Sequence, residues 1–169
     1  MAMNANGMIA KENDDTSWVS DTEWEGFKEF VKRAGNIVIG RRTYEVMKRG
    51  GEFNVLGDIK VFVLTHDFYI GDDNPNIIFT DQHPRDLVES IQNQGFSEIL
   101  ITGGGNLNAL FMKEGLVDEI YLDIEPKVFG KGIKLFADED FEADLELIDI
   151  KKFSPNEIQL HYKVKKWLS

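Results

Sequence analysis

The chain has no cysteine, only three histidines, and far fewer basic than acidic side chains. Without cysteine it forms no disulfide, no thiol nucleophile and no thiolate zinc site. His66, His83 and His161 are scattered, so we expect no metal centre. The 19 Lys and Arg residues stand against 30 Asp and Glu, a net charge of −11. Nucleic-acid binding needs an excess of cations, so we expect no nucleic-acid partner.

Long hydrophobic runs are missing as well. No apolar stretch approaches the roughly 20 residues that cross a bilayer, and no charged-then-apolar leader stands at the start of the sequence. We therefore expect a cytoplasmic protein with no membrane partner. The 169 residues are 42% hydrophobic and 29% charged, which predicts a single globular domain over residues 1–169.

Short β-rich apolar runs alternate with helical patterns, and this order predicts an α/β fold. Continuous apolar runs are typical of parallel strands buried on both faces. Two alternating segments near the end, separated by Ser154, Pro155 and Asn156, predict an antiparallel hairpin that closes one side of a mostly parallel sheet. The expected strands are 37–39, 61–65, 77–80, 99–102, 120–124, 145–152 and 158–166, and the expected helices are 21–33, 43–49, 84–93 and 106–114.

A strand passes directly into a helix through three glycines in EILITGGGNLNALF, residues 98–111. A helix that begins with glycines has unpaired backbone N–H groups at its start, where the positive end of the helix dipole also lies. Both favour the binding of a phosphate there. The alternative is a tight turn without a ligand, because GGG lacks the spacing of GxGxxG.

A second strand–helix turn, NIVIGRRTYE, covers residues 36–45. Gly40 ends the strand, Arg41 and Arg42 follow, and Thr43 can cap the helix. An Arg fork pairs with phosphate oxygens in two-point contacts, although surface arginines can also be merely solvated. Both turns lie at the carboxyl ends of strands, where α/β sheets bind ligands. Together they suit a long ligand with two phosphate groups.

The sequence allows two interpretations of Glu23, as part of a helix cap or as an acid in a pocket. Ser20 and Glu23 form the S-x-x-E pattern of a capping box, while Glu23, Phe27 and Phe30 share one helix face. A carboxylate on an aromatic face borders the core or a pocket, and burial raises its pKa. The alternatives of cap and pocket acid both stay open, and Asp21 is a rival acid.

Three segments, in this order, resemble the dihydrofolate reductase superfamily, which includes the riboflavin-type (RibD C-terminal) reductase domain. NGMIAKENDDTSW (6–18) is similar to the first-strand and mobile-loop segment, IGRRTYE to the NADPH-binding turn, and TGGG to a glycine turn with a cis Gly–Gly bond. GGGNLNALFMKEGLVDEIYLDIEPKVFGKG (103–132) resembles the riboflavin-type domain. The resemblance implies a three-layer fold and NADPH as cofactor.

The resemblance also implies residue roles. Glu23 would be the substrate-binding catalytic acid, and Asp123, in place of a threonine, would bring a second carboxylate near it. Ile59 and Asn108 depart from the folate-type pattern. The substrate pocket would be lined by Ile9, Trp18, Phe27, Met47 and Asp123. NADPH would be held by Gly40, Arg41, Arg42, Thr43, Thr65, His66, Gly103, Gly104, Gly105, Asn106 and Leu107.

We therefore expect an NADPH-dependent reductase of a pterin-type heterocycle, with dihydrofolate as first candidate and loop 7–20 closing over the site. One alternative is the 5-amino-6-(5-phosphoribosylamino)uracil reductase reaction of riboflavin biosynthesis, for which Lys11, Lys48, Arg49 or Lys60 must bind the substrate phosphate. Another is a nucleotide-binding module without catalysis. The hairpin or residues 126–136 could form a homodimer interface.

Overall fold

The computed structural model describes residues 1–67 and 71–165. Its helices are α1 (Asp21–Ala34), α2 (Arg41–Gly50), α3 (Pro84–Asn93) and α4 (Gly105–Lys113), with a short 3-10 turn η1 (Glu52–Asn54). Its strands are β1 (Ala2–Asn4), β2 (Met8–Ala10), β3 (Asn36–Gly40), β4 (Lys60–Leu64), β5 (Ile77–Thr80), β6 (Leu100–Ile101), β7 (Glu119–Glu125), β8 (Ile133–Lys134), β9 (Leu145–Lys152) and β10 (Ile158–Val164). Every expected helix and strand is present.

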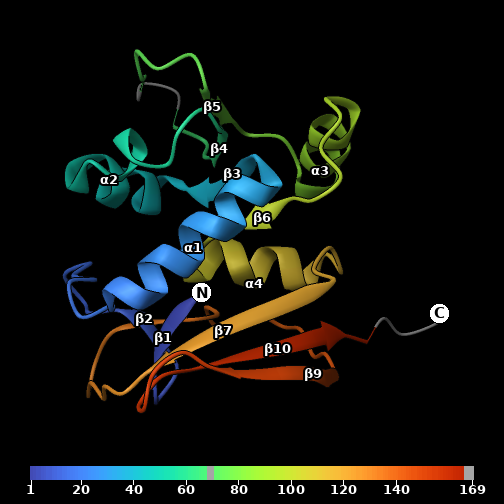
Figure 1. Cartoon of the computed structure of the whole chain (residues 1–169). Coiled ribbons are helices and arrows are strands. Elements are labelled where there is room, and N and C mark those ends of the chain that lie inside the picture. Colours follow the sequence, from blue (N-terminus) through green and yellow to red (C-terminus); the bar gives the residue numbers. More distant parts are fainter. Residues whose placement is uncertain (68–70, 166–169) are drawn as a thin grey trace.

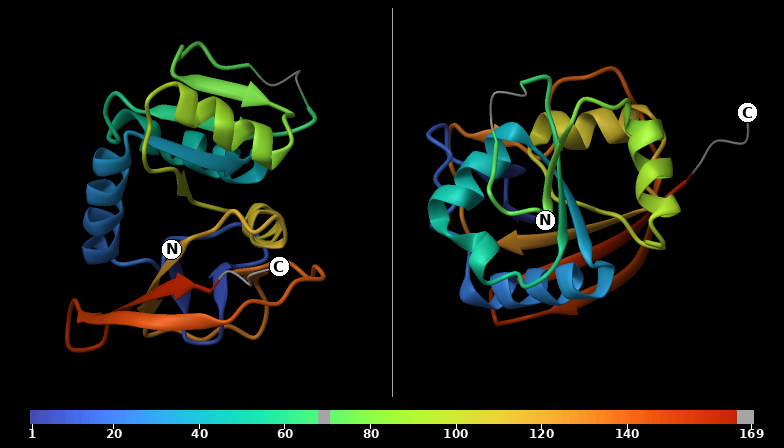
Figure 2. Two further views of the ribbon diagram at one scale, coloured as in Figure 1. Left: turned by 90° about the vertical axis from the view of Figure 1, so that its right-hand side faces the viewer. Right: turned by 90° about the horizontal axis from the view of Figure 1, so that it is seen from above.

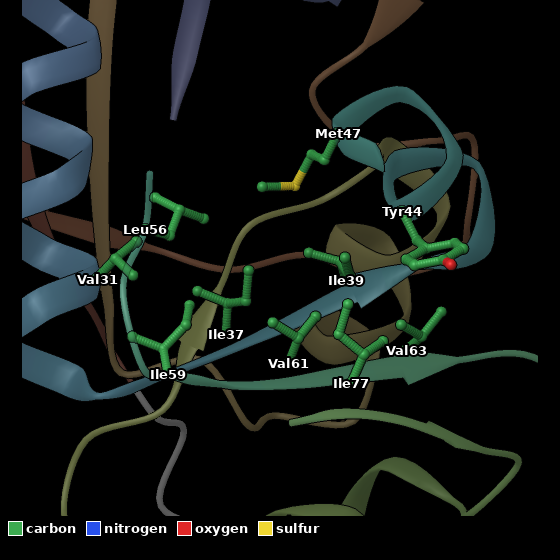
Figure 3. Packing of buried hydrophobic residues seen from close by; sticks show 10 residues of the cluster. All are labelled: Val31, Ile37, Ile39, Tyr44, Met47, Leu56, Ile59, Val61, Val63 and Ile77. Atoms are coloured by element: carbon green, nitrogen blue, oxygen red, sulfur yellow. The ribbon is translucent and has the colours of Figure 1, made fainter. Parts of the chain in front are cut away.

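A parallel sheet in the order β5-β4-β3-β6 forms the middle layer of one half of the molecule (Figure 1). Successive side chains of a strand point to opposite faces. Ile37 and Ile39 therefore pack with Val31 of α1 and Met47 of α2, as Figure 3 shows. Val38 packs on the other face, in a cluster with residues of α3 and α4. Helices cover both faces, which confirms the three-layer α/β class.

The hairpin of β9 and β10 forms as expected but lies in a second sheet, which corrects the expected arrangement. That sheet has the order β1-β7-β10-β9, with β1 parallel to β7 and the others antiparallel. Figure 2 shows the two sheets apart, joined through α1 and the segment after β6. β6 has two residues and β1 three, and β1 pairs only with β7, so no hydrogen-bonded ladder joins the sheets in the described part.

The observed ends of the helices and strands differ from the expected ones by at most two residues. α2 begins at Arg41 rather than residue 43, because Gly40 already has the extended backbone of a helix N-cap. The hairpin's second strand ends at Val164. The last residue expected in it, Lys166, lies outside the described residues.

Candidate active site

Two of the four α-helices in the described part of the chain begin without a side-chain cap, and these two starts lie together. α1 and α3 are capped by Ser20 and His83, whose side chains accept a backbone N–H of the first turn. α2 and α4 follow Gly40 and Gly104, and neither start has a side-chain cap. Uncapped N–H groups and two positive dipole ends at one place form a ready anion site.

A hydrogen bond joins the two turns. The N–H of Gly40 donates to the carbonyl oxygen of Gly103 over 2.8 Å. A Cβ built on Gly104 would meet the hydroxyl of Thr43 at 3.4 Å. The glycine turn and the arginine turn expected from the sequence are thus adjacent at the carboxyl ends of β3 and β6.

The three glycines of this turn are needed for different physical reasons. Gly103 has φ +97°, which favours glycine, and its peptide bond to Gly104 is cis, as the resemblance implied. A Cβ on Gly105 would stand 2.4 Å from the carbonyl oxygen of Lys134. Gly105 therefore allows close packing of the α4 start against β8 and the residues that follow it. Gly103 and Gly104 are the two that face the arginine turn.

Arg41 and Arg42 stand exposed at the start of α2. Arg41 pairs with Glu45 over 2.8 Å, and Arg42 pairs with Asp14 over 2.6 Å. Arg42 also donates to the carbonyl of Glu12 over 3.2 Å, so it ties the loop of residues 7–20 to this helix. Exposed ion pairs contribute at most about 1 kcal/mol. A bound phosphate can therefore replace the acidic partners.

The other expected cofactor residues lie around these turns. Thr65 follows β4, the strand beside β3, and its hydroxyl accepts the N–H of Asp67 over 3.0 Å. His66 is exposed next to it. Asn106 is exposed in the first turn of α4, whereas the Leu107 side chain is 5% exposed in the core, so only its backbone can face a ligand. Their contact with a cofactor stays a prediction.

A cavity of about 520 Å³ lies between the two sheets. Glu23 and Phe27 of α1 line it from one side, and Asp123 of β7 lines it from the other. Thr102, immediately before the glycine turn, also lines it, and its buried hydroxyl has no hydrogen-bond partner. The cavity therefore reaches from the paired acids to Thr102, the residue just before the glycine turn.

Glu23 is 8% exposed and its pKa is raised from the ordinary 4.5 to about 7. Burial is the main cause, because a charged carboxylate is poorly solvated there. The charges of Asp123 and Glu125 raise the pKa further, against the Met1 ammonium and a hydrogen bond from the Ala2 N–H. The expected second carboxylate beside Glu23 is thus present. A carboxyl group with this pKa can both accept and donate a proton near neutral pH.

The structure separates the two readings of Glu23. Ser20 caps α1 by accepting the N–H of Glu23 over 3.1 Å. The other half of the capping box, the Ser20 N–H, is bound by Glu125 of β7 over 2.8 Å. Glu23 is therefore free of the cap and turns to the cavity. Sequence reasoning missed Glu125 because it lies 105 positions away from Ser20.

Asp123 is fixed by two contacts. Gln159 of β10 donates to its Oδ1 over 2.7 Å, and the Met1 ammonium lies 3.3 Å from its Oδ2. Gln159, like Thr102, was not expected from the sequence, although the alternation of β10 could have marked it as a polar residue on one face. Both extend the site beyond the expected residues.

Three expected pocket residues do not line this cavity. Ile9 lies in β2, Trp18 packs edge-on against Phe129 with centroids 5.0 Å apart, and Met47 is 5% exposed in the core cluster of Figure 3. Their place in a substrate pocket stays a prediction. Asn108 does line the cavity, and its Nδ2 is bound to the carbonyl of Leu135 over 2.8 Å.

Two joined helix starts that form an anion site, with a buried acid in a cavity beside them, fit a reductase with the dihydrofolate reductase-like fold. The RibD C-terminal domain family model matches residues 1–159, and the chain belongs to this family. The protein is an oxidoreductase, which decides against a non-catalytic module. No helix in residues 1–67 and 71–165 is long and apolar enough to cross a membrane.

Two proteins of Bacillus subtilis (strain 168) are similar in sequence. One is 32% identical over 167 residues, covering 96% of this chain and 94% of its own length, and is called uncharacterized protein YwjB. The other, uncharacterized protein YyaP, is 24% identical over 171 residues, with 96% and 91% covered. Neither name states a substrate.

Solved structures show the same fold at low identity. A putative riboflavin biosynthesis protein from Shewanella has a TM-score of 0.82 and 22% identity, covering 98% of this chain and 97% of its own. The Thermotoga maritima deaminase/5-amino-6-(5-phosphoribosylamino)uracil reductase has a TM-score of 0.75 and 17% identity, and the match spans 97% of this chain and 55% of that protein. A pyrimidine reductase-like protein from Corynebacterium diphtheriae has a TM-score of 0.73 and 16% identity, with 98% and 90% covered.

Proposed function

We propose that the protein is an NADPH-dependent reductase of a small nitrogen heterocycle, and that Glu23 is its acid. When bound, NADPH supplies the hydride. The uncapped starts of α2 and α4 with Arg41 and Arg42 would hold its phosphates, and Thr102 offers an unpaired hydroxyl beside them. The observation that carries the proposal is the buried Glu23, with its pKa raised to about 7, in the cavity beside this anion site.

Glu23 suits the amino and N–H edge of an aminopyrimidine ring. As a carboxylate it accepts these N–H groups, and as an acid it supplies the proton that completes the reduction, to a nitrogen or oxygen of the substrate. Gln159 holds Asp123 by a hydrogen bond, and the negative charge of Asp123 near Glu23 favours the protonated form of Glu23.

The first candidate reaction is 5-amino-6-(5-phosphoribosylamino)uracil reduction. Membership of the RibD C-terminal domain family supports it, together with the fold shared with the Thermotoga maritima reductase. The family match therefore ranks this alternative above dihydrofolate, the candidate placed first from sequence alone.

A pterin, with dihydrofolate as example, is the second candidate. The cations expected to bind a substrate phosphate do not line the cavity that holds Glu23, namely Lys11, Lys48, Arg49 and Lys60. Of those expected to bind a substrate phosphate, Lys11 pairs with Asp15 over 2.6 Å and Lys48 with Asp72 over 3.0 Å. Lys60 donates to Asn76 over 2.7 Å. A substrate without phosphate needs none of these cations.

A panel of substrates tests both candidate reactions. Purified protein is mixed with NADPH and either dihydrofolate, an unsubstituted dihydropterin, or the ribosylaminouracil with and without its 5′-phosphate, and loss of NADPH absorbance is followed. Glu23→Gln should lower kcat/KM by roughly 10²–10⁴-fold. Glu25→Gln, on the exposed side of the same helix, should leave it unchanged. Turnover of no heterocycle, or equal turnover by Glu23→Gln, contradicts the proposal.

A further inference from the structure

The cavity beside Glu23 carries an excess of acidic side chains. Five carboxyl groups line it, those of Glu23, Glu98, Asp118, Glu119 and Asp123. Among its described lining residues, Arg33 is the one Lys or Arg, and the Met1 ammonium is the other cation. The cavity is therefore negatively charged whether or not Glu23 holds its proton.

Both cations are already paired with carboxylates. Arg33 donates from two guanidinium nitrogens to the two carboxylate oxygens of Glu98, and its Nε lies 2.9 Å from Oε2. The Met1 ammonium lies 3.3 Å from Asp123 and donates to the carbonyl oxygen of Tyr121 over 2.8 Å. A phosphate or carboxylate that enters the cavity must therefore compete with acids that belong to the protein.

The acids stand at both ends of the cavity. Glu119, Tyr121 and Asp123 alternate along β7, so their side chains point to the same side of the sheet, and all three line the cavity. Four residues of a strand span about 13 Å. Asp123 lies at the end of Glu23, whose pKa its charge raises. A ligand with its ring at Glu23 therefore extends its tail toward Glu119.

Glu119 is ionised at neutral pH. His161 and Tyr121 donate to its Oε2 over 2.8 Å and 3.0 Å. These hydrogen bonds hold the pKa of Glu119 below its ordinary value. The far end of the cavity thus keeps a negative charge, which repels an anionic tail.

Between the two ends the walls are aromatic. Phe27 and Phe30 line the cavity from α1, and Tyr121 lines it from β7. The rings of Phe30 and Tyr121 have their centroids 4.7 Å apart. Aromatic faces pack against flat rings, and carboxylates accept N–H groups. Such walls suit a flat ring with several N–H groups and no negative charge.

We propose that the cavity selects an uncharged or cationic nitrogen heterocycle and rejects a substrate with a phosphate or carboxylate tail, a selection that rests on the proposed function. It favours an unsubstituted dihydropterin over dihydrofolate, and the ribosylaminouracil without its 5′-phosphate over the phosphorylated compound. Family membership alone ranks the phosphorylated compound first, and the charge of this cavity reverses that order. The cofactor escapes this rejection, because Arg41 and Arg42 at its expected phosphate site do not line the cavity.

Isothermal titration calorimetry of the full chain, with NADP⁺ in place of NADPH so that no reduction occurs, tests the proposal. The probes are the two pairs of compounds just named. The member without phosphate or carboxylate should bind at least about tenfold more tightly in each pair, because like charges brought together in a partly desolvated site repel. The ribosylaminouracil pair differs only in the phosphate and so isolates the effect of charge.

Variants at the far end of the cavity test the cause. Glu98→Gln removes a carboxylate and releases Arg33, so it should raise the affinity for the phosphorylated probe about tenfold and leave that for the other member nearly unchanged. Glu119→Gln should act in the same direction. Glu29→Gln, an exposed position of α1 that does not line the cavity, is the matched control and should change neither affinity. Circular dichroism verifies the fold of each variant.

Equal or tighter binding of the anionic members by the wild type overturns the proposal, and so does binding of none of the four probes. A preference that both Glu98→Gln and Glu119→Gln leave unchanged overturns it as well. Turnover is a separate readout. Selective binding without any loss of NADPH absorbance in the substrate panel would contradict the proposed reaction and leave the charge selection intact.

Discussion

At the scale of single residues, Glu23 combines function with a cost in stability. Its carboxyl group is buried with two other carboxylates near, and this raises its pKa to about 7. Between the ordinary value of 4.5 and about 7, the folded state holds a proton that the unfolded state has lost. Stability therefore falls as the pH rises through this window and stays lower above it.

Glu23→Gln should therefore be more stable than the wild type at pH 8, by a few kcal/mol at most, because the neutral amide avoids the buried charge. Near pH 4 the two proteins should unfold at similar temperatures. Thermal unfolding followed by circular dichroism at both values measures this. A variant less stable than the wild type at pH 8 would show that the carboxylate, not the acid, is the favoured form.

The same pKa sets the pH dependence of the reaction. If protonated Glu23 supplies the proton, kcat/KM should be level below about pH 7 and fall roughly tenfold per pH unit above it. Steady-state rates across this range with the best substrate of the panel measure the profile. The falling limb should disappear in Glu23→Gln, leaving a low and flat activity.

Gly105 and Gly26 give a second residue-scale prediction. A Cβ on Gly105 would overlap the carbonyl oxygen of Lys134, so Gly105→Ala should destabilise the fold by about 2–3 kcal/mol. A Cβ on Gly26, inside α1, would meet nothing, so Gly26→Ala should stabilise it by about 0.5–1 kcal/mol. Urea unfolding of both variants measures these effects, and equal stability of the two would contradict the assigned packing role.

At the scale of elements, the start of α2 is shared between the loop of residues 7–20 and the expected cofactor. Arg42 is held by Asp14 and by the Glu12 carbonyl. A phosphate that binds Arg42 has to displace the Asp14 carboxylate. The loop and the cofactor are therefore coupled through one guanidinium group.

Asp14→Asn should consequently bind NADPH about 2- to 5-fold more tightly, since the competing charge is removed while the side chain keeps its size. Arg42→Ala should bind NADPH more weakly, by about tenfold, as expected for loss of a charge-assisted contact. Arg85→Ala on α3, which breaks an ion pair with Glu114 at the end of α4, is the matched control and should not change the affinity. Fluorescence titration with NADPH provides the dissociation constants.

Helices and strands that neighbouring residues determine were predictable from the sequence, whereas contacts between distant elements were not. α3 and β5 match their expected bounds because His83, Pro84 and a compact apolar run mark them locally. The split capping of Ser20, by contrast, depends on Glu125, and the fixing of Asp123 depends on Gln159. These partners come together only through strand pairing, which spacing in the sequence does not reveal.

The hairpin shows the same limit on a larger scale. Its alternation predicted two strands with one apolar face, and both are present. Alternation does not say which face meets the core, and here the polar face does. The sequence likewise contains no direct sign that β1 and β6 do not pair with each other and that a cavity lies between the sheets.

At the scale of the whole molecule, the site depends on two sheets that no hydrogen-bonded ladder joins in the described part of the chain. Helix α1 and the segment after β6 connect them, and the cavity lies between them.

The bond between the Ser20 N–H and Glu125 has a consequence for synthesis on the ribosome. The acid-bearing helix leaves the exit tunnel early, but the strand that fixes its start, and Gln159 behind Asp123, emerge more than a hundred residues later. At about 5–20 residues per second, this gap lasts from several seconds to some tens of seconds. During that time α1 can pack on β3, yet Glu23 still lacks the neighbours that set its pKa. A nascent chain therefore forms part of its fold before its site is assembled.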